Sequence, residues 1–81
     1  MFKKCLYIAY ITYLDLQEVS AETFILGVSK KADEARNLLI SNLKGKVEMG
    51  FRKTDFEIWP WVWTYENQYV KIKAQVTMIY L

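Results

Sequence analysis

Histidine is absent from this chain of 81 residues, and cysteine occurs only once, at Cys5. Without histidine, the commonest general base and metal ligand is missing, and no Ser-His or Cys-His nucleophile pair can form. A single cysteine closes no internal disulfide and offers no cluster of thiolate ligands for zinc. These absences predict a protein that is not an enzyme, that holds no metal or other cofactor, and that works in a reducing, cytoplasmic compartment.

Carboxylate pairs are the remaining candidates for acid-base chemistry. Asp15 stands close in sequence to Glu18 and Glu22, and Asp55 is two residues from Glu57. Such pairs can act as general acid and base. Nothing in the surrounding sequence distinguishes them from solvated charges, so we expect no catalytic role for them.

Long hydrophobic runs are also missing. The basic start at Met1–Lys4 and the apolar stretch that follows, up to Leu14, are similar to a signal peptide, but no small-residue cleavage site comes after them. The stretch is too short for a membrane helix. We therefore expect no association with a membrane.

The composition indicates one compact domain over residues 1–81. Hydrophobic residues make up 53% of the chain and charged residues 25%, which is typical of a folded protein. A core made by one helix and a few strands cannot use all of this apolar surface. A homodimer is therefore expected.

The hydrophobic pattern predicts four strands. Residues 2–14 are apolar on both faces, as in a central strand, and residues 23–28 place Phe24, Leu26 and Val28 on one side of a second strand paired with the first. Residues 55–65 are again typical of a strand, and residues 70–80 alternate between apolar and polar side chains, which predicts one buried and one wet face.

A single helix is predicted between the second and third strands. Ser29 can accept a hydrogen bond as its N-cap, and Gly45 can take the left-handed conformation that ends it. The apolar stripe at helical spacing consists of Ala32, Ala35, Leu39 and Leu43. The fold class is therefore α+β, ββαββ, with a four-stranded, mainly antiparallel sheet and one helix packed on one face.

An aromatic stretch dominates the last third of the chain. It alternates Trp59, Trp61, Trp63 and Tyr65, and the direction of these rings depends on the turn that follows them. A two-residue loop at 66–67 places Trp63 opposite Val70, in the core. A three-residue loop at 66–68 instead interleaves the rings with lysines, as a docking surface. Under that alternative the partner-binding residues are Trp59, Trp61, Trp63, Tyr65, Tyr69, Lys71 and Lys73.

Basic residues concentrate in the middle third of the chain. They suggest a patch for an anionic partner, made of Lys30, Lys31, Arg36, Lys44, Lys46, Arg52 and Lys53. A small nucleic-acid-binding protein is therefore an alternative, although the net charge of +2 is low for that function. A small-ligand pocket between two copies is a further alternative.

The stretch from Phe24 to Ser29 and on through Ala35 to Leu39 resembles a strand-into-helix element of small bacterial and phage domains. In size and in missing chemistry the chain is similar to small phage-encoded accessory proteins, including inhibitors of host defence. That resemblance implies a non-catalytic protein-protein interaction module that blocks a partner's surface. We expect this function, with another protein as the partner, bound through the aromatic residues of the hairpin from Trp59 to Tyr69 and aided by the basic segment.

Overall fold

The computed structural model describes residues 4–81 and has the expected α+β architecture. Its elements are β1 (Cys5–Asp15), β2 (Ser20–Ser29), α1 (Ala32–Leu43), the 3-10 turns η1 (Val47–Met49) and η2 (Lys53–Phe56), β3 (Val62–Glu66) and β4 (Val70–Tyr80). The ββαββ order is confirmed. The first two residues of the predicted first strand, Phe2 and Lys3, lie outside the described residues.

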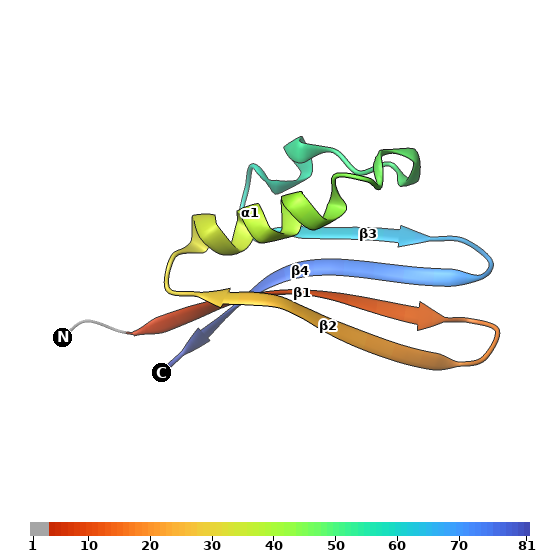
Figure 1. Cartoon of the computed structure of the whole chain (residues 1–81), viewed down its shortest axis with the longest axis horizontal. Helices are drawn as coiled ribbons and strands as arrows, with labels where there is room; N and C mark the ends of the chain where they lie inside the picture. Colours follow the sequence, from red (N-terminus) through yellow and green to blue (C-terminus); the bar gives the residue numbers. More distant parts are fainter. Residues whose placement is uncertain (1–3) are drawn as a thin grey trace.

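The described strands form one antiparallel sheet in the order β2-β1-β4-β3. β1 is central, as predicted, because β2 pairs with one of its edges and β4 with the other (Figure 1). Its two faces are not both covered, however. α1 and the two 3-10 turns all lie on the same side of the sheet (Figure 1).

The start of α1 lies two residues later than a Ser29 N-cap requires. The helix begins at Ala32 with Lys31 in the N-cap position, and Lys31 makes no capping side-chain bond. Ser29 still organises this end, because its Oγ accepts a hydrogen bond from the Lys31 amide and donates one to Glu34. The side chain thus shapes the turn into the helix instead of capping it.

The end of α1 also differs from the prediction. The helix ends at Leu43, and the Lys46 amide donates to the Leu43 carbonyl at 2.8 Å, so the chain turns directly toward η1. Gly45 has no positive φ. The left-handed glycine is Gly50, with φ 85°, which ends η1.

A β-bulge in β2 changes which side chains share a face of that strand, so the predicted faces were wrong. Ala9 pairs with Gly27 but Tyr10 pairs with Ile25, so Leu26 is an extra residue. An extra residue reverses the alternation beyond it. Phe24 and Leu26 therefore lie on the helix side of the sheet, as Ile11 and Tyr13 do, whereas Val28 points to the other side.

The third strand is shorter than predicted. Residues 53–56 form the η2 turn, and β3 begins only at Val62. The peptide bond between Trp59 and Pro60 is cis, and Pro60 has no amide hydrogen for a strand ladder. Pro60 therefore precedes an edge strand, which is where a sheet tolerates proline.

The β3–β4 turn lies further along the chain than either predicted loop. Glu66 pairs with Lys71, and the Asn67 amide donates to the Val70 carbonyl at 3.0 Å, which leaves Gln68 and Tyr69 between them. Trp63 consequently lies opposite Ala74, not opposite Val70 or Lys71. Both predicted registers were wrong, because neither pairs Trp63 with Ala74. The two-residue loop nevertheless places the same side chains on each face of the sheet as the structure does.

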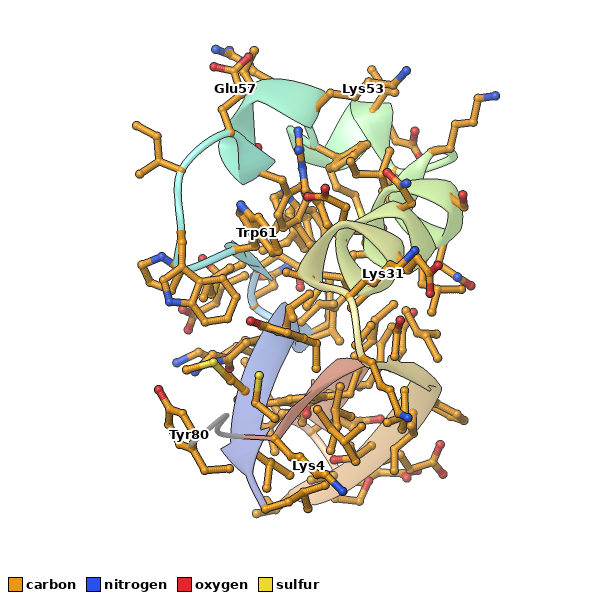
Figure 2. All side chains as sticks on the ribbon, turned by 90° about the vertical axis from the view of Figure 1, so that its left-hand side faces the viewer. Lys4, Lys31, Lys53, Glu57, Trp61 and Tyr80 are labelled. Carbon is orange, nitrogen blue, oxygen red and sulfur yellow. The ribbon has the colours of Figure 1, made fainter. Side chains whose placement is uncertain are left out.

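The core lies between the sheet and the helical layer. Figure 2 shows Trp61 above β4, below η2 and beside α1. The buried hydrophobic side chains are Ala9, Ile11, Ala35, Leu39, Leu43, Phe51, Phe56, Trp61, Trp63, Ile72, Ala74 and Val76.

The helix is much shorter than the sheet beneath it. Twelve helical residues span about 18 Å, whereas the 11 residues of β1 span about 36 Å. Figure 1 shows the turn end of the β1–β2 hairpin extending beyond α1. The helical layer therefore leaves part of the side it covers exposed.

Candidate functional site

The predicted aromatic-lysine surface is divided between the two sides of the sheet. Trp61 and Trp63 are buried, with 8% and 5% of their surface exposed. Tyr65 stacks on Trp63 with ring centroids 6.4 Å apart. Lys71 and Lys73 are exposed but point to the opposite side, because their neighbours Ile72 and Ala74 face the core. The tryptophans therefore do not alternate with lysines on one surface.

Among the aromatic residues of the predicted docking surface, only Trp59 and Tyr69 are exposed. Trp59 is 44% exposed and meets Trp61 and Tyr7 edge to face, at 5.1 and 6.1 Å between ring centroids. The Arg36 guanidinium lies 5.6 Å from the centre of the Trp61 ring, within cation-π range. Tyr69 is exposed in the β3–β4 turn, at the far end of the strand.

The predicted basic residues do not converge on one patch. Lys31 precedes α1 and Lys44 follows it, so about 18 Å of helix separates them. In Figure 2, Lys53 lies at the outer end of the helical layer, away from Lys31. The remaining members are distributed along the same segments: Lys30 beside Lys31, Arg36 within α1, Lys46 after it, and Arg52 before η2.

A groove instead forms where α1 stops short of the hairpin end. It has a volume of about 550 Å³, and its lining residues come from β1, β2 and the last turns of α1: Ile11, Tyr13, Phe24, Leu26 and Asn42. Phe24 is 49% exposed, and its ring meets Tyr13 edge to face at 5.7 Å. The floor is apolar and accessible from outside.

Asn42 supplies the polar edge of this groove. Its Nδ2 donates to the carbonyl oxygen of Leu38 at 2.8 Å. The Oδ1 of the same amide accepts no hydrogen bond within the described part of the chain. An acceptor at the edge of an apolar floor can receive the backbone amide of a bound segment.

An acidic depression continues the groove toward the β1–β2 turn. It has a volume of about 300 Å³ and shares Tyr13 with the groove; the other lining residues are Asp15, Glu18, Ser20, Glu22 and Val70. Glu22 pairs with Tyr13 across the strands, next to Phe24 and Ile11. Apolar and acidic side chains thus form one continuous surface, here called the apolar-acidic groove.

The acidic end holds carboxylates in two different states. Asp15 Oδ1 accepts hydrogen bonds from the backbone amides of Gln17 and Glu18, at 2.9 and 3.1 Å, and so fixes the turn. The carboxylates of Glu18 and Glu22 form no ion pair or hydrogen bond with any residue from 4 to 81. Two negative charges are therefore available to a cationic ligand.

The other predicted carboxylate pair has a structural contact. Asp55 Oδ2 accepts a hydrogen bond from the Arg52 amide at 3.1 Å, in the capping box of η2.

Across residues 4–81, no cluster of three or more cysteine, aspartate or glutamate side chains could hold a metal ion. In the same range, no helix is long and apolar enough to span a membrane.

Sequence reasoning missed the apolar-acidic groove because its residues come from separate elements. Tyr13, Glu22 and Phe24 become neighbours only through the β1–β2 register, and Phe24 is exposed only because α1 ends at Leu43. The signal in the sequence that could have indicated the groove was the short predicted helix beside much longer predicted strands.

Comparisons with family models, with curated proteins and with solved structures returned no match.

Proposed function

We propose that this protein is a non-catalytic interaction module that binds a segment of another protein in the apolar-acidic groove. The observation that carries the proposal is the continuity of the exposed Phe24–Tyr13 floor with the unpaired carboxylates of Glu18 and Glu22. The groove's volume falls in the range of about 300–1,000 Å³ that is typical of binding pockets. Binding there needs no chemistry that the chain lacks.

The shape and charge of the groove define the ligand. Its apolar floor suits one or two large aliphatic or aromatic side chains, whose burial drives binding. Its acidic end suits a lysine or arginine that follows them along the bound segment. The expected ligand is therefore an exposed protein segment with apolar residues next to basic ones.

The biological role we propose is blocking of the bound protein's surface in the cytoplasm, in the manner of small phage-encoded inhibitors. Occupying an exposed basic segment of a larger protein prevents that segment from making its other contacts. The nucleic-acid alternative has less support from the geometry. The continuous groove is acidic, which repels phosphates, and the basic residues are distributed over both ends of α1.

A pair of synthetic peptides tests the proposal. One carries leucine and phenylalanine followed by two lysines, and the other replaces the lysines by glutamates. The lysine peptide should bind at least about tenfold more tightly, because two surface ion pairs together contribute about 1.4 kcal/mol. Its affinity should fall between about 0.05 and 0.5 M salt, since exposed charges are screened. Equal affinities in a calorimetric titration would contradict the proposed ligand chemistry.

Matched variants locate the binding site. Phe24→Ser and Glu22→Lys should each weaken the lysine peptide, because they remove the floor and reverse a charge of the groove. Val47→Ser and Glu57→Lys are the controls, since both residues are exposed and lie outside the groove. An equal loss in the controls would place the binding site elsewhere.

A further inference from the structure

The side of the sheet that faces away from α1 has an apolar end. This side, here called the open face, carries the even-numbered side chains of β1 and β3 and the odd-numbered side chains of β4. Ile25 and Val28 of β2 lie on it with 67% and 53% of their surface exposed, and Ile79 of β4 with 41%. Leu6, Ile8 and Val62 complete the apolar end.

Two pairs of polar side chains beside this apolar end are already hydrogen-bonded to each other, which leaves the Thr77 hydroxyl, opposite Ile8, as the polar group that an interface must accommodate. The Tyr10 hydroxyl donates to Gln75 Oε1 at 2.8 Å, and the hydroxyls of Thr12 and Thr23 lie 3.2 Å apart. Burying a polar group is costly mainly when it loses its hydrogen bond. A dry partner surface can therefore cover this end of the sheet at little cost.

Within the strands, the charged side chains of the open face lie at its other end, whereas Lys4 and Lys30 lie beside Leu6 at the edge of the apolar end. Lys71, Lys73 and Glu66 project at that other end from β4 and β3, near the hairpin turns. Lys71 and Glu66 are directly paired across the strands. The open face is thus divided into an apolar end and a charged rim, which is the arrangement of an interface core beside solvent.

The chain exposes more surface than a compact monomer of its size. A monomer of 9.6 kDa is expected to expose about 5,100 Å², whereas this chain exposes 5950 Å². The difference of about 850 Å² is close to the ~800 Å² that each partner buries in a standard interface. The radius of gyration is 13.6 Å, against about 11.7 Å for a compact chain, because the molecule is elongated and thin, with extents of 48 × 26 × 16 Å.

We infer that a second copy of this chain covers the apolar end of the open face. Two copies related by a twofold axis present the same apolar surface to each other, which satisfies the requirement of a symmetric interface. Their sheets stack face to face, as in aligned sheet packing, with Lys71 and Lys73 in water at the rim. The result is a dimer of four layers: helix, sheet, sheet and helix.

This dimer leaves both apolar-acidic grooves accessible. The groove lies on the helix side of each sheet, and the interface lies on the opposite side. The two grooves therefore point away from each other, and a dimer has one at each outer surface. The inference does not depend on the proposed ligand, because it concerns the other side of the sheet.

The mass of the full chain in solution tests the inference. Standard interfaces have dissociation constants from micromolar to picomolar. Sedimentation equilibrium at about 1 to 500 µM protein therefore covers concentrations at which such a dimer forms, and the mass should reach twice 9.6 kDa. Ile25→Lys should shift the protein to the monomer mass, because it places a charge in the dry interface. Val47→Lys is the control, because Val47 is also 67% exposed but lies in η1. It should remain dimeric.

Circular dichroism establishes whether each variant folds. If Ile25→Lys is unfolded, Val28→Lys replaces it as the test. A wild-type monomer over the whole range, a species larger than a dimer, or a dimer that neither folded variant disrupts would overturn the inference. None of these results affects the peptide titrations, so failure of the dimer and failure of the groove can be told apart.

Discussion

Trp63 lies directly opposite Ala74 where β3 pairs with β4, and both side chains are buried beneath the helical layer. The pairing of a large ring with a small side chain leaves room for Phe51, whose ring meets Trp63 edge to face at 6.2 Å. The most conspicuous residues of the sequence thus serve the core. The exposed surfaces that can bind a partner lie elsewhere.

Replacing the two outer tryptophans of the stretch should have unequal effects on stability. Trp63→Ala removes a buried ring and should lower the free energy of unfolding by about 3–5 kcal/mol. Trp59→Ala should lower it by about 1 kcal/mol, because 44% of this ring is already exposed. Urea unfolding followed by circular dichroism measures both values. Equal losses would contradict the assigned burial.

Asn67→Ala should weaken the β3–β4 turn. Asn67 Oδ1 accepts hydrogen bonds from the amides of Tyr69 and Val70, at 2.8 and 2.9 Å, as asparagine does in Asx turns. We expect a loss of about 1 kcal/mol, or about 4–8 °C in the melting temperature of a domain of this size. Gln68→Ala, in the same turn, should leave the melting temperature unchanged. A similar decrease for both variants would exclude the specific role of Asn67.

The fold class could be predicted because the strand and helix periodicities are strong and local. The alternation from Val70 to Tyr80 and the apolar stripe of Ala35, Leu39 and Leu43 both appear in the structure. The register could not be predicted, because the position of the turn depends on hydrogen bonds made by Asn67. Moving the turn by two residues changes every cross-strand pair by four, which keeps the same side chains on each face.

The candidate site depended on features that single-strand patterns do not contain. The bulge at Leu26 places Phe24 and Val28 on opposite faces of the sheet, although simple alternation predicts that they share one face. The exposure of Phe24 follows from where α1 ends, and helix ends are poorly defined by local sequence. The lysines near the helix looked like a patch because they are close in sequence, but the helix separates them in space.

Gly27→Ala should destabilise the contact between β2 and α1. A Cβ added at Gly27 would lie 2.5 Å from Leu38 Cδ1, which is closer than carbon atoms pack. Overpacking of a closed core costs about 1–3 kcal/mol, and the cost here should lie at or below the lower end of that range, because Leu38 is only partly buried and its side chain can shift. The obstacle is the end of one side chain. The double variant with Gly27→Ala and Leu38→Ala should therefore lose less stability than the sum of the losses of the two single variants. Strict additivity in a double-mutant cycle would exclude this contact.

Tyr7 should make stability decrease at alkaline pH. Its hydrogen bond with Cys5, together with partial burial and the charges of Cys5 and Tyr80, raises the pKa of Tyr7 above its ordinary value of 10.0. The unfolded chain therefore loses this proton at a lower pH than the folded chain does. The stabilisation is complete below pH 10 and is lost as the pH rises through the folded pKa.

The measurement compares urea unfolding of the wild type with that of Tyr7→Phe at pH 9 and pH 11, on either side of the ordinary tyrosine pKa of about 10. The wild type should lose more stability between the two conditions than the variant. The other tyrosines, present in both proteins, provide the internal control. Equal losses would show that ionisation of Tyr7 is not linked to folding.

The most direct test of binding in the apolar-acidic groove is a heteronuclear NMR titration of the full chain with the lysine-containing peptide. Amide signals of β1 and β2 around Tyr13, Glu22 and Phe24, and that of Asn42, should shift progressively, while those of residues 44–57 stay in place. The glutamate peptide should shift none of them at the same concentration. Shifts confined to residues 44–57, or spread equally over the chain, would contradict binding in this groove.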